Sequence, residues 1–514
     1  MTFTSSMHRK IYPTHLIFFL ALAGSTSLPP VFAAEPPTAR RPSALLRPSV
    51  EKVFNRINAD VLKNGRAYET LADASQRIGH RLTGSNNGAR AEQYAYDLLR
   101  SYGFKDVRYE TFEVESWMRD TVTLAIVPNK SDNFRDLKVV SLAHSPVEAH
   151  VRAEIVDVGN GLEGDFATLK DKIKGKIALI NIGLSNAKGA RNLHRSEKTA
   201  LAIQHGAIGV IMVNLVPGNV LLTGTASVTG KLIPIPAVCI AYESGVAVRQ
   251  WLAEENKDHL HAVIDMSNTS RKIKARNVVA TLPGSEFPSE KIVIGGHLDS
   301  WDLATGAIDN GIGSFSVLDI ARTFRKLKLK PKRTVEFVMF MGEEQGLLGS
   351  RAMTENLKKR GQLDNVRYMM NLDMTNDPGG INAFGRDDMV MFFKSIGETM
   401  QKVDPTFQNQ ITNQAGLHSD HQPFMIEGVP VVGMNGHLTK EVLDCYHANC
   451  DRIDLANRDQ MQNTVRYSAM VLYALADAKT IPTRRFDDTK TRDYLVAQGL
   501  RTPLQIANEW RWKE

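Results

Sequence analysis

A histidine suited to metal or acid–base chemistry follows one of the short apolar runs in this 514-residue sequence. His297 comes directly after the apolar and glycine residues 292–296, and Asp299 stands two positions later. Ligands of open α/β sheets bind beyond the carboxyl ends of strands, where a histidine after such a run would lie. Asp299 could accept the hydrogen of the second ring nitrogen of His297, fixing the tautomer and raising the basicity of the ring. A His-x-Asp pair alone is common, so other donors are needed to define a site.

Acidic residues and a second histidine occupy comparable places in further motifs. Asp309 stands just before a helical pattern, a position where aspartate often only caps the helix. Glu343 and Glu344 follow another apolar run, and adjacent carboxylates repel each other unless a cation shares the site. Asp373 ends a third apolar run, and His447 lies in a loop between helical patterns.

Taken together, these residues predict a metal centre. Two histidines and three carboxylates form a mixed nitrogen and oxygen donor set, which suits zinc-like divalent ions. A carboxylate can bridge two such ions about 3.5–4 Å apart and leave a shared water between them. Glu343, next to Glu344 but pointing elsewhere, would be free to take the proton of that water. The expected metal ligands are His297, Asp309, Glu344, Asp373 and His447.

The motifs resemble the zinc exopeptidase family with co-catalytic metals, in the stretches GGHLDSWD, AIDNGIG, MGEEQGLLGS, NLDM and YHANCD. The family includes secreted bacterial aminopeptidases, glutamate carboxypeptidase II and plasma glutamate carboxypeptidase. Residues 296–302 are most similar to the plasma glutamate carboxypeptidase branch, whose members are secreted dipeptidases. The resemblance covers most of the chain after residue 34. It implies a three-layer α/β/α domain with a mixed, largely parallel sheet, and an inserted β-rich protease-associated domain.

The resemblance also implies a role for each site residue. Asp309 would bridge two zinc ions, and Glu343 would be the general base. Asp299 would orient His297, and Tyr446 resembles a family tyrosine that donates to the oxyanion of the tetrahedral intermediate. The remaining ligands would divide between the two ions: His297 and Glu344 on separate ions, Asp373 with one and His447 with the other.

The order of patterns along the chain predicts how these residues are carried. From residue 277 apolar runs alternate with helical patterns, which indicates a largely parallel sheet covered on both faces. The first residues combine basic side chains, a short apolar core and small residues before a cleavage site after Ala33 or Ala34, which is typical of a secretory signal peptide. We expect a signal peptide at 1–34, a linker at 35–48, the first part of the peptidase domain at 49–124, the protease-associated insert at 125–270, the second part of the peptidase domain at 271–480 and a C-terminal extension at 481–514.

The composition excludes several classes of protein. Hydrophobic residues make up 43% and charged residues 23% of the chain, an ordinary globular balance that excludes wholesale disorder. The net charge of +7 is weak support for a nucleic-acid partner, because Arg9 and Lys10 lie in the predicted signal peptide. No later run reaches the roughly 20 apolar residues of a membrane span. We therefore expect a secreted or periplasmic protein without a nucleic-acid partner or a membrane anchor after cleavage, and resemblance to the plasma enzyme implies a homodimer.

Three cysteines are too few to hold a chain of this length together. Cys445 and Cys450 flank His447, and in an exported protein they could form a disulfide that holds this loop. Two free thiols are the alternative, and thiolate metal ligands are disfavoured because the nitrogen and oxygen donor set is already complete. Cys239 lies in an apolar run and is expected to be a buried thiol.

The sequence thus predicts an exported two-zinc exopeptidase that hydrolyses dipeptides or short peptides with a free N-terminus. An aminopeptidase acting on longer peptides is the main alternative, because pocket loops and not the metal motifs decide between them. A glutaminyl cyclase, which uses one metal, and a receptor-like protein that has lost its metals are disfavoured by the complete ligand set.

Overall fold

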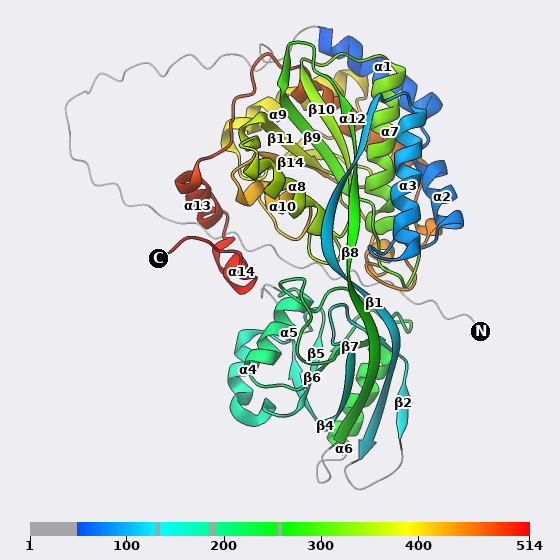
Figure 1. Ribbon diagram of the computed structural model, residues 1–514, viewed down its shortest axis with the longest axis vertical. Coiled ribbons are helices and arrows are strands. Elements are labelled where there is room, and N and C mark those ends of the chain that lie inside the picture. The colour runs from blue at the N-terminus through cyan, green and yellow to red at the C-terminus, as the bar shows by residue number, and fades with distance from the viewer. Residues whose placement is uncertain (1–48, 129–133, 186–191, 255–259, 514) are drawn as a thin grey trace, which may run out of the picture. The chain divides into compact units, whose positions relative to one another are not determined.

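The structure is a computed structural model and describes residues 49–128, 134–185, 192–254 and 260–513 (Figure 1). The predicted signal peptide and linker, residues 1–48, lie outside the described residues. Within the described ranges, no helix combines the length and the apolar character that crossing a membrane requires.

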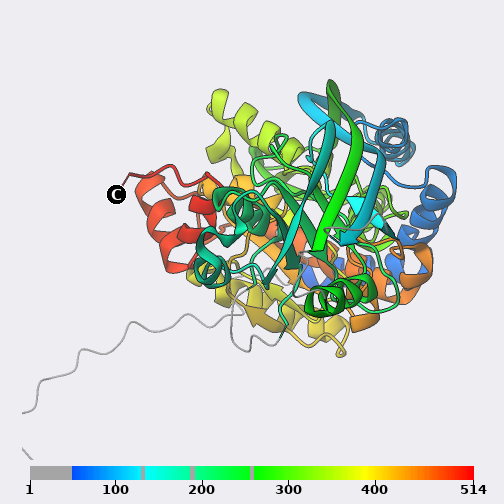
Figure 2. The same cartoon turned by 90° about the horizontal axis from the view of Figure 1, so that it is seen from below.

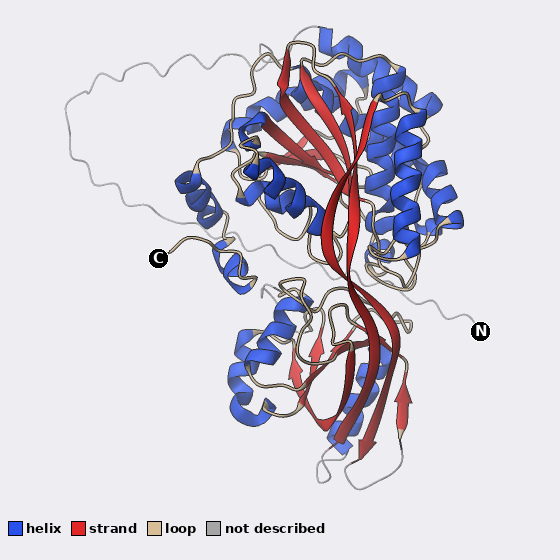
Figure 3. Ribbon diagram, in the orientation of Figure 1, coloured by secondary structure: helices blue, strands red, loops and turns tan. Residues whose placement is uncertain are grey.

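A mixed sheet lies at the centre of the larger, α/β domain (Figure 3). Its central strands run parallel to one another, with an antiparallel neighbour on either side. In spatial order from one edge the strands are β13 (Gln410–Thr412), β12 (Gly380–Asn382), β14 (Val431–Asn435), β11 (Val366–Asn371), β9 (Phe287–His297), β10 (Arg333–Phe340) and β8 (Leu260–Leu282), and β8 pairs on its other side with β1 (Asp106–Pro128).

The central strands are apolar on both faces, which explains why they read as unbroken apolar runs in the sequence. In β9, Ile292 and Ile294 pack on one side of the sheet and Val293 on the other, and in β10 Phe337 and Phe340 divide in the same way. Helices cover both faces, so the predicted three-layer α/β/α fold is confirmed. The first layer holds α1 (Ser49–Asn64), α2 (Ala67–Arg77), α3 (Asn86–Ser101), α7 (Ile312–Lys326), α9 (Asp387–Val403) and α12 (Arg458–Asp477), and the second holds α8 (Leu348–Lys359), α10 (His421–Ile426), α13 (Asp488–Ala497) and α14 (Arg501–Ile506).

A long two-stranded ribbon connects the α/β domain with the insert. β1 (Asp106–Pro128) pairs antiparallel with β8 along its whole length, from Asp106 opposite Thr281 to Pro128 opposite Leu260. One end of β8 also pairs with β10, and the other end pairs with β4 (Glu148–Gly159), so β1, β8 and β4 run side by side (Figure 2). The boundaries predicted after residues 124 and 270 fall inside β1 and β8.

The insert is itself an α/β unit. Four of its strands are parallel, and one antiparallel strand closes the edge. Cys239 is buried in this sheet, as predicted. Besides β4, the elements are β2 (Arg135–Leu137), which pairs with β1, β3 (Val139–Ser141), β5 (Ile177–Asn181), β6 (Gly209–Val213), β7 (Ala237–Ile240), α4 (Glu163–Leu169), α5 (Arg195–Gln204) and α6 (Tyr242–Glu254).

Gly296 lies where β9 passes close to the chain that follows β11. A Cβ at this position would stand 2.5 Å from the main-chain oxygen of Leu372 and 3.2 Å from Asn310 Nδ2. Gly296→Ala should therefore push two strands apart and lower the melting temperature of the α/β domain by about 4 °C or more. At Gly416, a Cβ would meet nothing within 4 Å, so Gly416→Ala should change stability by less than about 0.5 kcal/mol. Scanning calorimetry that found equal melting for both variants would contradict this close approach.

Candidate metal centre

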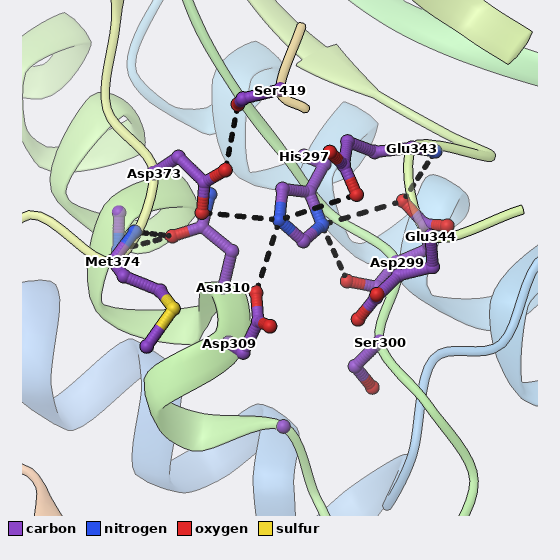
Figure 4. Close-up of polar contacts among 12 residues, drawn as sticks. His297, Asp299, Ser300, Asp309, Asn310, Glu343, Glu344, Asp373, Met374 and Ser419 are labelled. Carbon is purple, nitrogen blue, oxygen red and sulfur yellow. Dashed lines mark hydrogen bonds and ion pairs between the residues drawn. The ribbon is translucent and has the colours of Figure 1, made fainter. Parts of the chain in front are cut away.

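The carboxyl edge of the central strands carries most of the predicted site residues (Figure 4). His297 is the last residue of β9, Glu343 and Glu344 follow β10, and Asp373 comes two positions after β11. Because β11, β9 and β10 are neighbouring parallel strands, their ends bring these side chains to one place.

Asp309 lies between two histidines. It belongs to the turn Ala307–Gly311 before α7, whereas His447 stands in the loop after the short helix α11 (Lys440–Leu443). Asp309 Oδ1 is 3.2 Å from His297 Nε2, and Asp309 Oδ2 is 2.9 Å from His447 Nε2. A carboxylate with one oxygen towards each histidine has the arrangement of a bridging ligand.

Asp373 and Glu344 complete two donor groups around Asp309. Asp373 Oδ1 lies 3.4 Å from His297 Nε2, and Glu344 Oε2 lies 3.0 Å from His447 Nε2. The structure therefore brings all five predicted ligands together, in two groups that share Asp309. The groups are His297, Asp309 and Asp373, and Asp309, Glu344 and His447, and the donor atoms of each group lie within 4.8 Å of one another.

The electrostatics of this cluster fit divalent cations. Burial raises the pKa of Glu344 and raises the pKa of Glu343 well above its usual range. Burial alone would lower the pKa of His297, but the charges of Glu343 and Asp373 raise it well above its usual value. Glu344 Oε1 is buried and accepts no hydrogen bond. Charged carboxylates that are buried without full hydrogen bonding destabilise the fold unless a cation balances them. Zinc binds mixed sets of histidine and carboxylate donors such as this one.

Asp299 connects three parts of the site. Its main-chain oxygen lies 3.1 Å from His297 Nδ1, whereas its carboxylate Oδ1 is 3.6 Å from the same nitrogen. The carboxylate accepts hydrogen bonds from Thr83 Oγ1 at 3.0 Å and from the main-chain N–H of Glu343 at 3.3 Å. The main chain of Asp299 thus provides the nearer acceptor for the ring, and its fully buried side chain fixes the start of the Glu343 loop.

The insert contributes a buried cation beside His447. Nη2 of Arg195, at the start of α5, lies 2.8 Å from His447 Nδ1, and the Arg195 side chain lies against Gly224, where a Cβ would come within 2.0 Å of Nη2. Arg195 is only 5% exposed, and its Nε has no hydrogen-bond partner. On the chain beside His447, the Tyr446 ring stacks on the imidazole with centroids 4.0 Å apart.

Cys445 and Cys450 are joined by a disulfide across the His447 loop. Of the alternatives left open by the sequence, the structure therefore has the disulfide, and neither sulfur is a metal ligand. The bridge closes a loop of few residues around His447, which restricts the positions that this histidine can take.

Several residues that hold the centre in place escaped the sequence analysis. The Asp451 carboxylate accepts the main-chain N–H groups of Ile308 and Asp309 at 2.7 and 3.0 Å, and so fixes the turn that carries the shared ligand. Asn310 donates to the oxygen of Leu372 and thereby ties this turn to the chain before Asp373. Fully buried Arg81 donates to the main-chain oxygens of Leu298, Thr305 and Gly306, all of which precede the same turn. The partners of Asp451 and Arg81 are more than a hundred positions away, which left no local signal.

A cavity of about 310 Å³ opens onto the donor cluster. Its walls come from the insert, from the loops after β10 and β11, from the loop before α10 and from the residues after α13. The lining includes Asp309, Glu343, Glu344, Asp373, Tyr446 and His447 of the predicted site, together with residues of the insert such as His194, Arg195 and Glu197.

The fold and the donor set define a class, the zinc-dependent exopeptidases with an inserted domain, and comparison with known proteins agrees. Residues 277–472 match Peptidase family M28, and residues 150–248 match the PA domain. The chain is a zinc-dependent exopeptidase whose catalytic domain matches peptidase family M28, with a PA domain inserted into it. The predicted membership of the zinc exopeptidases and the predicted protease-associated insert are both confirmed.

Curated relatives include carboxypeptidase Q from Bos taurus, which is 26% identical over 82% of this chain and 87% of its own length. A probable leucine aminopeptidase 2 from Trichophyton verrucosum is 26% identical over 73% and 72%. Among solved structures, a Peptidase M28 precursor from Shewanella amazonensis shares the fold with a TM-score of 0.72, at 24% identity over 85% of this chain and 99% of its own. The aminopeptidase from Aneurinibacillus sp. strain AM-1 has a TM-score of 0.62, at 24% identity over 85% and 98%.

Removing the charge of Asp299 should weaken the centre. Asp299→Asn keeps the size of the side chain but loses the charge that holds the Glu343 loop and faces His297, so zinc affinity or activity should fall by roughly 10–100-fold. Thr83→Val, which removes the donor to the same carboxylate, should show a smaller loss, whereas Thr83→Ser keeps the hydroxyl and should resemble the wild type. Zinc affinity is measured by competition with a chelating dye. An unchanged affinity and activity in Asp299→Asn would assign this aspartate a purely structural role.

Proposed function

We propose that this exopeptidase hydrolyses dipeptides or short peptides with a free N-terminus, uses two zinc ions and Glu343 as general base, and acts outside the cytoplasm. The observation that carries the proposal is the position of Asp309, with one carboxylate oxygen towards His297 and the other towards His447. Such a shared carboxylate supports a pair of ions, because a single ion would leave one of the two donor groups without a cation.

The proposed ligands would hold the two ions in the groups already described. His297 and Asp373 would hold one ion, Glu344 and His447 the other, and Asp309 both. When bound, zinc lowers the pKa of water towards neutrality and polarises the scissile carbonyl. The main-chain oxygen of Asp299 accepts the Nδ1 hydrogen of His297, which leaves Nε2 free to act as a ligand.

Glu343 is placed to move the proton of the reaction. It lines the cavity, and its Oε2 lies 3.9 Å from His297 Nε2 without being one of the clustered donors. Burial raises the pKa of Glu343, which makes its carboxylate a stronger base than an exposed glutamate. Glu343 takes a proton from the attacking water and then gives it to the departing amine nitrogen. Tyr446 lines the same cavity and would donate to the oxyanion that forms on the scissile carbonyl.

The size of the cavity supports small substrates. Ligand pockets commonly measure about 300–1,000 Å³, and a cavity of about 310 Å³ lies at the small end of this range. A dipeptide fits such a volume better than an extended chain does. The carboxylates in the lining favour the positive charge of a free amino terminus. The leucine aminopeptidases among the relatives favour the second candidate, an aminopeptidase that accepts longer peptides.

Export is proposed on two observations. The first residues have the pattern of a signal peptide, and the disulfide between Cys445 and Cys450 suits an oxidising compartment. A homodimer is proposed from the resemblance to the plasma enzyme, and light scattering of the purified protein tests it.

Replacing the proposed base should separate metal binding from turnover. Glu343→Gln keeps the size of the side chain but cannot accept the proton, so kcat should fall by about 10²–10⁴-fold while bound zinc is retained. Glu355→Gln, an exposed change in α8, is the matched control and should leave both unchanged. A variant at position 343 with near wild-type kcat would remove this glutamate from the mechanism.

Metal content and a substrate panel test the rest of the proposal. We expect about two zinc ions per chain by elemental analysis, and loss of activity after chelation that zinc restores. The panel compares a dipeptide, its N-acetylated form, and the corresponding tripeptide and tetrapeptide. Preference for the free dipeptide supports the proposal, and preference for the tetrapeptide supports the aminopeptidase alternative. Equal cleavage of the acetylated substrate would contradict both.

A further inference from the structure

The last part of the described chain, residues 488–513, supplies none of the proposed metal ligands and is here called the C-terminal segment. It contains α13, α14 and a short tail, and it packs on the face of the sheet that α8 and α10 cover. Leu495, Leu500 and Leu504 are buried there in one cluster with Phe424 and Met425 of α10. The segment is therefore a fixed part of the α/β domain.

The inner surface of the C-terminal segment reaches the cavity. Pro503, Ala507 and Glu509 all line it. The Glu509 carboxylate pairs with both terminal nitrogens of Arg351, at 2.7 and 3.1 Å, and accepts a hydrogen bond from Gln422 Nε2 at 3.0 Å. A two-point arginine–carboxylate pair fixes direction as well as distance, so it holds the segment in one position.

The partners of Glu509 lead directly to the catalytic loops. Arg351 donates from Nε to the oxygen of Gly346 at 3.0 Å, and the Gly346 N–H donates to the main-chain oxygen of Glu343 at 2.9 Å. Gln422 Oε1 accepts the main-chain N–H of His418, which lines the cavity. Glu509 thus joins two loops of the cavity to the C-terminal segment, while its own side chain forms part of the wall.

We propose that the C-terminal segment is an end wall of the substrate pocket and that Glu509, through its pair with Arg351, sets the length of peptide that the pocket accepts. The proposal rests on the proposed function, because it explains how a zinc exopeptidase centre is restricted to dipeptides. Glu509 touches no reacting atom and acts as a specificity-determining residue. Arg351 neutralises the charge of Glu509. The wall is therefore formed by an ion pair of fixed geometry, and Glu509 has no free charge with which to bind one end of the peptide.

The test compares peptide length preference in variants of the full chain. The measured quantity is kcat/KM for Ala-Ala-Ala divided by kcat/KM for Ala-Ala. Glu509→Ala and the double variant Arg351→Ala with Glu509→Ala, which leaves no unpaired charge, should raise this ratio by about tenfold or more, mainly through a lower KM for the tripeptide. Zinc content should stay as in the wild type.

Two further variants keep the test decisive. Arg511→Ala removes one ion pair that attaches the segment to Glu427 and one within the segment, to Asp488. Neither pair lines the cavity, so this variant should leave the ratio unchanged. Ala507→Phe adds bulk to the wall and should raise KM for Ala-Ala without loss of zinc. This variant tests the wall even if the loss of the ion pair prevents folding.

The outcomes separate the two levels of the proposal. A wild-type enzyme that does not cleave Ala-Ala refutes the proposed dipeptidase function itself. If the wild type cleaves Ala-Ala, an unchanged ratio in the folded double variant overturns the role of Glu509. An equal rise in Arg511→Ala also overturns it, because the ratio would then follow only the general attachment of the segment. Unchanged dipeptide KM in Ala507→Phe would show that the segment is no wall.

Discussion

The structure depends on one constraint: a single carboxylate, that of Asp309, must face two histidines that come from distant parts of the chain. His297 is fixed by the end of β9, whereas His447 stands in a loop 150 positions later. The distances of 3.2 and 2.9 Å leave little room for error on either side. The neighbouring carboxylates of Glu343, Glu344 and Asp373 add further negative charge in a buried place. The protein must therefore hold these carboxylates close together against their mutual repulsion, which bound cations would relieve.

The surrounding hydrogen bonds meet this constraint by fixing main chain more than side chain. Asp451 binds the N–H groups on the turn of Asp309, and Asn310 ties that turn to the chain before Asp373. Asp299 holds the N–H of Glu343. Each of these polar groups is buried and forms a hydrogen bond with the main chain. The path of the backbone therefore fixes where the proposed ligands lie.

The sequence could predict the elements whose signals are local. The central strands read as apolar runs, and the residues after them, such as His297 and Glu344, have the chemistry of zinc ligands. The sequence could not show Arg195 or Glu509 at the cavity, because each acquires its neighbours only when distant segments come together. It also could not show that the main-chain oxygen of Asp299 lies nearer to the ring of His297 than the carboxylate does, since this depends on the path of the backbone after β9.

The ribbon of β1 and β8 has a consequence for the insert. Its strands stay paired up to Pro128 opposite Leu260, so the chain leaves the α/β domain and returns to it at adjacent points. For the α/β domain, all residues between these points form one closed loop whose ends are already held together. The entropy of closing a loop grows only with the logarithm of its length. An insert of this size therefore adds little to the entropic cost of folding the α/β domain. A longer or shorter insert would leave the sheet, whose strand β9 ends at His297, undisturbed.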